Sequence, residues 1–169
     1  MNKRIVEFYE NLYSLSYITR YSGMAKIKDE SVAEHSFYVA SLVIELDKYY
    51  KFDVGKATII AVTHDWAEAA TGDITIAVKR EHPEIARAVK RATEVESMAY
   101  PKWLYRYHLE LSASETVESL IVHMADIIQC AQYSAHEIKL GNTGFMSDVY
   151  AESIARLTQI EERLVDYEQ

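Results

Sequence analysis

The stretch Ile59-Ile60-Ala61-Val62-Thr63-His64-Asp65 carries an imidazole and a carboxylate directly after a run of apolar residues. Burying such a pair costs free energy unless each group is hydrogen-bonded, paired with a charge or bound to a metal ion. Ala67 continues the apolar pattern before Thr71-Gly72, a pair typical of a helix end. We therefore expect a central helix that brings a polar pair into the core.

The rest of the chain has the same helical character. Most apolar residues recur at spacings of three and four, which is typical of amphipathic helices. The 169 residues include only two prolines and five glycines. The sequence contains no internal repeat, low-complexity run or linker. These features predict an all-α fold, with one domain that covers residues 1–169.

Six helices are predicted, with ends defined to within about four residues. They cover residues 3–18, 32–51, 54–71, 83–100, 116–140 and 145–165. Ser31 is the expected N-cap of the second helix, and Pro83 the first residue of the fourth. Ser112 with Glu115 has the spacing of a capping box ahead of the fifth helix, which Gly141-Asn142 should close.

Composition and charge exclude several classes of function. The formal charge of −8 disfavours a nucleic-acid polymer, whose binding requires many Lys and Arg side chains. A small anionic substrate is compatible if a few basic residues converge. The N-terminal residues alternate charged and apolar groups, unlike a secretory signal, and no later stretch is long and apolar enough for a bilayer. With one cysteine, Cys130, and no disulfide framework, the sequence predicts a cytoplasmic protein without a membrane partner.

Two further polar islands interrupt apolar helical faces. Glu34-His35 lies within the second predicted helix, and Asp126 is surrounded by apolar residues of the fifth. Glu68 follows His64 by four residues, so on a helix the two side chains would share a face. Ionisable residues from several helices that meet at an apolar surface are typical of metal sites in helical bundles.

The set His35, His64, Asp65 and Asp126 offers two imidazoles and two carboxylates. Such mixed ligands suit Mn, Co, Fe or Zn, and Mg less readily, so Co, Mn, Zn, Fe and Mg are not distinguished.

Each of these residues also has a simpler interpretation. A single buried His or Asp is more often satisfied by a hydrogen bond than by a metal ion. His123 lies three residues before Asp126 on the same face, so it is a rival ligand or a partner of one. His82, His108 and His136 have charged or polar neighbours and are expected in solvent.

Several motifs occur in a fixed order along the chain. They are Thr19-Arg20-Tyr21, Glu30-Ser31-Val32-Ala33-Glu34-His35-Ser36, His64-Asp65-Trp66-Ala67-Glu68, Thr71-Gly72-Asp73, Val78-Lys79 and Met124-Ala125-Asp126. In this combination the sequence resembles the HD-domain metal-dependent phosphohydrolases. More narrowly, it resembles the small bacterial 5′-deoxynucleotidases and the phage deoxynucleotide (dATP) triphosphohydrolases, and the match spans most of the chain.

The resemblance implies an HD-type helical bundle and roles for individual residues. One divalent metal ion would be held by His35, His64, Asp65 and Asp126. Glu68 and Asp73 would be the catalytic acid and base, in either order. Arg20 would contact the phosphate, because a guanidinium can bind two oxygens. Without the resemblance, Arg20 would be interpreted as part of a surface ion pair.

The substrate end departs from the family pattern. Tyr21 stands where relatives often have tryptophan, and Ile74-Thr75-Ile76-Ala77 replaces a proline-containing segment. Tyr21 could still stack on a base. Lys79, next to Arg80, would add positive charge for a substrate with more than one phosphate.

Three functions follow for this chain. The leading hypothesis is hydrolysis of a 2′-deoxynucleoside 5′-monophosphate to nucleoside and phosphate. The close alternative is release of triphosphate from a dNTP such as dATP. The third is a catalytically silent nucleotide sensor that keeps the metal for structure, against which the presence of Glu68 and Asp73 argues. The resemblance alone also implies a homo-oligomer, a dimer or larger.

Overall fold

The computed structural model describes residues 2–165 and 167, and these residues are helical apart from turns, loops and one bridge between Thr19 and Ser31. The nine helices of the described residues are α1 (Lys3–Ser14), α2 (Val32–Leu46), α3 (Val54–Thr63), α4 (Glu68–Thr71), α5 (Ile76–Glu81), α6 (Pro83–Ser97), α7 (Lys102–Ala113), α8 (Val117–Lys139) and α9 (Phe145–Val165). The predicted all-α fold is confirmed.

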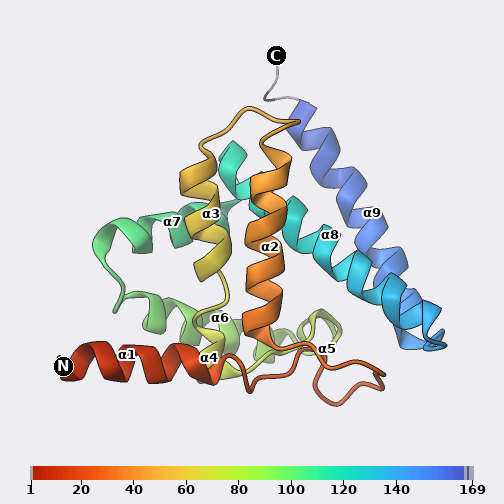
Figure 1. The fold of residues 1–169 in the computed structure, drawn as a ribbon, viewed down its shortest axis with the longest axis horizontal. Helices are drawn as coiled ribbons and strands as arrows, with labels where there is room; N and C mark the ends of the chain where they lie inside the picture. Colours follow the sequence, from red (N-terminus) through yellow and green to blue (C-terminus); the bar gives the residue numbers. More distant parts are fainter. Residues whose placement is uncertain (1, 166, 168–169) are drawn as a thin grey trace.

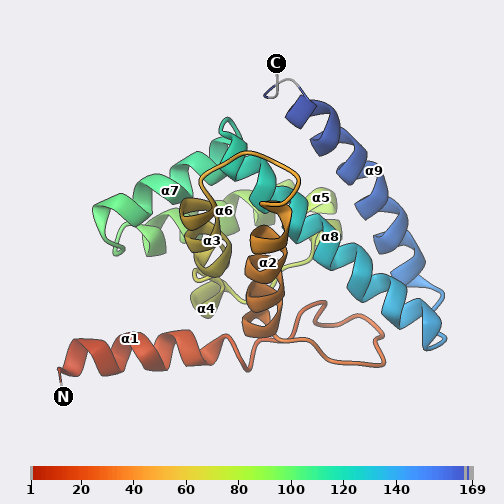
Figure 2. The ribbon, with the colours of Figure 1, turned by 45° about the horizontal axis from the view of Figure 1, so that its top comes forward.

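The centre of the molecule is built from α2, α3 and α8. Figure 1 shows α2 and α3 side by side, with α8 packed against both and α9 running alongside α8. Val39 and Val43 of α2, Ile60 of α3, and Leu120 and Ile121 of α8 are fully buried in one cluster. Figure 2 shows α1 below this bundle, leading into a long loop before α2. The helix that ends at the His-Asp pair is therefore central, as predicted.

Two of the predicted helix starts are confirmed by their caps. The Ser31 hydroxyl accepts from the backbone N–H of Glu34, and the Glu34 carboxylate accepts from the N–H of Ser31. This capping box explains Glu34, which is exposed and does not belong to the polar island of the core. Pro83 is in the first turn of α6, as expected.

Some helix ends differ from the prediction. α1 ends at Ser14 and α2 at Leu46, four and five residues before the expected ends. Tyr50 and Phe52 pack against the core from the turn that follows α2, so their burial does not need a longer helix. α8 and α9 agree with their predicted ranges, and Gly141 adopts φ 107° after α8.

The predicted third helix is wrong in one respect, because it breaks at the His-Asp pair. α3 ends at Thr63, and α4 begins only at Glu68. In between, the N–H of Trp66 donates to the Thr63 carbonyl and that of Glu68 to the Asp65 carbonyl, so three-residue turns replace the α-helical bonds. Glu68 and His64 therefore do not share one continuous helical face.

Two helices were missed, and one capping box was wrong. α5 follows Thr75, whose side chain caps it, and α7 covers Lys102–Ala113. Ser112 lies inside α7 and cannot cap the next helix. That cap is Thr116, whose hydroxyl accepts from the N–H of Ser119. The helical spacing of Leu104, His108 and Leu111 could have revealed α7.

No helix among residues 2–165 has the length and apolar character that crossing a membrane requires. The single domain over residues 1–169 stays a prediction, and its outermost residues, 1, 166 and 168–169, lie outside the described part of the chain.

Candidate metal centre

The cavity that holds the predicted site has a volume of about 420 Å³. We call the candidate ligands the inner wall: His35, His64, Asp65 and Asp126. We call the charged residues that α5 and α9 bring to the same cavity the outer rim: Lys79, Arg80, Asp148, Glu152 and Arg156. Glu68, Asp73, Arg20 and Tyr21 also line the cavity. The structure thus brings every residue predicted for the site to one cavity.

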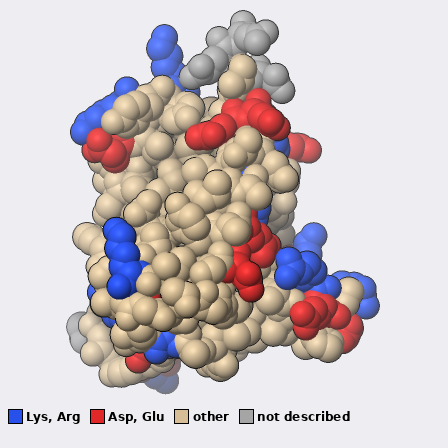
Figure 3. Space-filling view, turned by 90° about the vertical axis from the view of Figure 1, so that its right-hand side faces the viewer, with Lys and Arg blue, Asp and Glu red and all other residues tan. Residues whose placement is uncertain are grey.

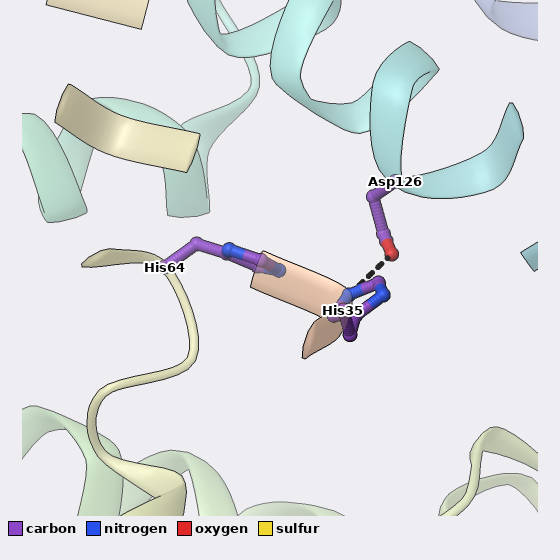
Figure 4. A group of neighbouring side chains, drawn as sticks. All are labelled: His35, His64 and Asp126. Carbon is purple, nitrogen blue, oxygen red and sulfur yellow. Dashed lines mark ion pairs between the residues drawn. The ribbon is translucent and has the colours of Figure 1, made fainter. Parts of the chain in front are cut away.

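Three helices supply the inner wall. Figure 4 shows His35 of α2, His64 from the end of α3 and Asp126 of α8 directed toward one another. One ligating atom from each lies within 4.8 Å of the others. His35 Nε2 is 3.2 Å from Asp126 Oδ1. This spacing allows the three side chains to bind a single ion.

Asp65 completes the inner wall from the turn after α3. Its Oδ2 atom lies 3.0 Å from His64 Nε2 and 3.5 Å from His35 Nε2. The broken helix explains this position, since the turn directs adjacent residues, His64 and Asp65, into the same cavity. Asp65 therefore lies beside both imidazoles, but outside the group of three whose ligating atoms all lie within 4.8 Å of one another.

The orientation of His64 leaves one nitrogen available. His64 Nδ1 lies 2.7 Å from the carbonyl oxygen of Ala61, so Nδ1 carries hydrogen and donates to it. In the neutral ring Nε2 then has a lone pair. This buried Nε2 has no hydrogen bond among the described residues, although it lies 3.0 Å from Asp65 Oδ2. An unsatisfied buried nitrogen that faces carboxylates is what a metal ligand requires, so the residues fit a divalent cation.

The ionisable groups of the inner wall shift one another's pKa values. Burial disfavours the imidazolium of His64, but the Asp65 and Asp126 carboxylates outweigh burial and raise its pKa to about 9. Although burial opposes ionisation, the neighbouring imidazoles hold the pKa of Asp65 and Asp126 well below the usual range for aspartate. The two carboxylates are thus ionised and attract a cation, either a proton on His64 or a metal ion.

Glu68 and Asp73 have different environments. Burial raises the pKa of Glu68 to about 9, with further contributions from the Asp65 and Asp73 carboxylates. Glu68 is therefore protonated at neutral pH in the absence of a cation. Asp73 accepts a hydrogen bond from the backbone N–H of Tyr21 at 2.8 Å. Asp73 thus also joins the loop before α2 to the cavity.

Arg20 is not part of a surface ion pair. Its side chain is only 11% exposed, and Nη1 lies 3.1 Å from Glu30 Oε2 and 2.8 Å from Gln129 Oε1. Nη2 contacts the Cys130 sulfur at 3.3 Å, and burial raises the pKa of this thiol. Arg20 lines the cavity but is largely held by protein groups.

Tyr21 has little free aromatic surface. The residue is 8% exposed and its ring stacks on Tyr133, with centroids 5.5 Å apart. The Arg20 guanidinium carbon lies 5.2 Å from the Tyr21 ring centroid. Tyr21 also has φ 53°, an uncommon value for a residue other than glycine. These contacts make Tyr21 a wall of the cavity and leave its stacking on a base as a prediction.

The outer rim has partly unpaired charges. The side chains of Lys79 and Arg156 make no hydrogen bond or ion pair with any described residue. Arg80 lies 3.4 Å from Glu152. Figure 3 shows the face on the right of Figure 1, where basic and acidic side chains form separate small groups on a largely uncharged surface. That face, as far as the structure describes it, offers no continuous basic strip to a polyanion.

Two expectations about histidines are resolved. His123 does not compete for the metal, because its Nε2 contacts the Ser114 hydroxyl at 2.8 Å and the Leu111 carbonyl at 3.1 Å. The expectation that His108 is solvated is wrong. It faces α3, where Nε2 lies 3.1 Å from the Thr63 hydroxyl, and burial lowers its pKa to about 4. His82 and His136 are exposed, as predicted.

Other cavity residues were missed by the sequence analysis. Asp148, Glu152 and Arg156 are spaced by four residues on α9, so one helical face presents them to the cavity. That spacing is visible in the sequence. Gln129 and Glu30 contact Arg20 and were also missed, since neither residue type signals a site on its own.

Comparisons with known proteins agree with this geometry. A family model described as 5′-deoxynucleotidase YfbR-like matches residues 7–168. The 5′-deoxynucleotidase of Pasteurella multocida is 32% identical over 156 residues, which cover 84% of this chain and 80% of the relative. The 5′-deoxynucleotidase of Photorhabdus laumondii is 30% identical over 154 residues, which cover 82% of this chain and 77% of the relative.

Solved structures show the same architecture. An HD-domain phosphohydrolase from Listeria innocua superposes with a TM-score of 0.76 and 25% identity, over 94% of this chain and 82% of that one. A protein from Pyrococcus horikoshii superposes with a TM-score of 0.77 and 22% identity over 96% of each chain, and shows the fold alone.

Proposed function

The chain belongs to the YfbR-like family of 5′-deoxynucleotidases, and on this premise we propose that it hydrolyses a 2′-deoxynucleoside 5′-monophosphate to nucleoside and phosphate with a divalent metal ion. The observation that carries the proposal is the buried His64 Nε2, which has no hydrogen-bond partner among the described residues and lies beside His35, Asp65 and Asp126.

The four inner-wall residues would hold the ion: His35 and His64 through Nε2, Asp65 and Asp126 through carboxylate oxygens. A bound divalent ion supplies charge stabilisation at the phosphoryl group and makes water a better nucleophile. The mixed nitrogen and oxygen donors leave the identity and number of ions open among Mn, Co, Fe, Zn and Mg.

Glu68 is suited to hold the proton that the leaving nucleoside requires. Without a cation in the cavity the carboxylic acid form prevails at neutral pH, because burial and the Asp65 and Asp73 carboxylates raise the pKa of Glu68 to about 9. A general acid must be protonated before the reaction and close to the leaving oxygen. Asp73 faces the same cavity from a position fixed by the Tyr21 N–H, so it is the candidate for the base.

Arg20 and Lys79 would position the phosphate. Both line the cavity, and phosphoryl transfer depends chiefly on positioning and on stabilising charge. Since Nη1 of Arg20 is held by Glu30 and Gln129, the guanidinium is rigid and offers the phosphate only its remaining hydrogens. Lys79 has no such partner and is free to follow the substrate.

Release of triphosphate from a dNTP is the second candidate function. The unpaired Lys79 and Arg156 at the outer rim favour it, because further phosphates would need cations beyond the inner wall. A homo-oligomer and a cytoplasmic location stay predictions.

Product analysis tests the proposal. The metal-loaded protein is incubated with panels of dNMPs, NMPs and dNTPs, and the products are separated by chromatography. Nucleoside and phosphate from dNMPs are expected. Triphosphate from dNTPs alone would support the second candidate. If the protein binds nucleotide but turns over none of the substrates with any of Mn²⁺, Co²⁺, Zn²⁺ and Mg²⁺, both candidate activities are contradicted and a nucleotide sensor is favoured.

A further inference from the structure

We propose that Gln129 is a positioning residue that keeps His35 in the tautomer able to bind a metal ion through Nε2. The inference rests on the proposed metal site. His35 is only 1% exposed, and its Nδ1 lies 2.8 Å from Gln129 Oε1. Gln129 lies on α8, three residues after Asp126, so one helix supplies both a ligand and the group that orients another ligand.

Glu30 fixes the orientation of the Gln129 amide. Gln129 Nε2 donates to Glu30 Oε1 at 2.7 Å, and an ionised carboxylate can only accept. Gln129 Oε1 must then point the other way, where it accepts from Arg20 Nη1 at 2.8 Å. Both neighbours therefore require the same orientation, and an oxygen faces His35.

The hydrogens of Arg20 determine the partner of His35. Nη1 carries two hydrogens but lies within hydrogen-bond distance of three groups: Glu30 Oε2, Gln129 Oε1 and His35 Nδ1. Donation to the two oxygens uses both hydrogens. Nδ1 of His35 must then carry its own hydrogen and donate to Gln129. In the neutral ring this leaves the lone pair on Nε2, 3.2 Å from the Asp126 carboxylate, an arrangement that a cation between the two would stabilise.

Without the Gln129 oxygen, the preference would reverse. Arg20 Nη1 lies 2.8 Å from His35 Nδ1, so it would donate to a lone pair there. The ring hydrogen would then move to Nε2, which lies 3.2 Å from Asp126 Oδ1 and would donate to it. That tautomer occupies the nitrogen that the metal needs.

Two measurements on the full chain test this role. Long-range ¹H–¹⁵N spectra of metal-free protein, labelled at histidine nitrogens and recorded where the rings are neutral, report which nitrogen of His35 carries hydrogen. Titration with Mn²⁺ gives the metal affinity. We expect hydrogen on Nδ1 in the wild type. In Gln129→Met we expect hydrogen on Nε2 and an affinity lower by about 10–100-fold, the usual effect of removing the partner of a ligating histidine.

Matched variants separate this effect from a general structural one. Gln132→Met makes the same change at an exposed position of α8 and should leave both readouts unchanged. The double variant Glu30→Gln/Gln129→Glu exchanges the two groups, so one amide still faces one carboxylate and an oxygen still faces His35. It should restore the Nδ1 hydrogen and most of the affinity. Unchanged Mn²⁺ affinity in Gln129→Met, or Nε2 hydrogen in the wild type, would overturn the proposal.

The remaining outcomes are also informative. If Gln129→Met does not fold, the wild-type spectrum and the affinity of Glu30→Gln/Gln129→Glu decide the question. Failure of the wild type to bind any of Mn²⁺, Co²⁺, Fe²⁺, Zn²⁺ and Mg²⁺ would contradict the proposed metal site itself. The tautomer measurement needs no metal and would still decide the role of Gln129.

Discussion

The inner wall and the outer rim of one cavity are built in opposite ways. On the inner wall, each imidazole is fixed through Nδ1, His64 by the Ala61 carbonyl and His35 by Gln129, and both present Nε2 to carboxylates. On the outer rim, Lys79 and Arg156 lack a partner among the described residues, and the single pair, Arg80 with Glu152, is at 3.4 Å.

The difference indicates that the two regions have different functions. Preorganised groups in a site of low dielectric constant stabilise charge without rearranging, so the inner wall suits the chemical step. Charges that are accessible to solvent and not held by protein partners are screened and adapt to different ligands at little cost, so the outer rim suits selection among substrates. Changes at the inner wall should therefore remove activity, and changes at the rim should alter preference.

The largest effect is expected for Asp65→Ala. Loss of a charged ligand leaves two imidazoles and one carboxylate, so metal binding and hydrolysis should both be abolished. Asp65 lies in a turn, so the helices should persist by circular dichroism. Asp47→Ala, which removes an exposed aspartate at the end of α2, is the control. A fully active, metal-free Asp65→Ala protein would refute the inner wall as the metal site.

Glu68→Gln should lower kcat by about 10²–10⁴-fold, the usual contribution of a general acid or base. Metal affinity should change far less, because Glu68 is not a proposed ligand. The two quantities are measured by steady-state kinetics at saturating metal and by metal titration. Glu81→Gln, at an exposed position of α5, is the control. Equal losses in both quantities would instead assign Glu68 to the metal shell.

The affinity for metal should rise with pH by about tenfold per unit until the pKa of His64 is reached, because binding must displace a proton. That pKa is raised from 6.5 to about 9, so His64 is charged at neutral pH and neutral only above pH 9.

The free energy of unfolding of the metal-free protein should also depend on the protonation of His64. The stabilisation that charged His64 contributes is complete below pH 6.5 and is lost as the pH rises through 9. Calorimetric titration with the metal ion across this pH range would measure how the affinity changes with pH. An affinity that does not depend on pH would contradict a protonated His64.

The smallest effect is expected at the outer rim. Lys79→Gln should raise KM for a dNMP by less than about fivefold, since a charge pair that water can reach contributes up to about 1 kcal/mol. A dNTP, which reaches further along the rim, should be affected more. Lys90→Gln, at an exposed position of α6, is the control. A loss of kcat equal to that of Glu68→Gln would end the distinction between the two regions.

Helix content and the candidate ligands were accessible from the sequence for a simple reason. Apolar periodicity reports burial, and a charged residue on a buried face is costly enough to stand out, as at His35, His64 and Asp126. The break at His64 was not accessible, because the local sequence is compatible with a continuous helix. In the folded chain, three-residue turns replace the α-helical hydrogen bonds after Thr63, and the adjacent side chains of His64 and Asp65 both enter one cavity.

Gln129 is an example of a site residue that could not be predicted from the sequence. Glutamine is common on helix surfaces, and nothing in its neighbourhood distinguishes it from Gln132, which is exposed on the same helix. Its contacts lie 94 residues away at His35, 99 at Glu30 and 109 at Arg20. No local pattern contains such pairings.

Sequence patterns were sufficient to infer the helical architecture, the candidate ligands and, through the motifs, the family. These depend on local periodicity and on the cost of burying charge, both of which are properties of short segments. The folded arrangement was needed to establish which nitrogen of each imidazole faces the cavity and which group holds it there. It also decided that Tyr21 is enclosed and that α9 contributes to the rim. Hydrogen-bond direction depends on atoms brought together from distant segments, and those distances exist only in the folded chain.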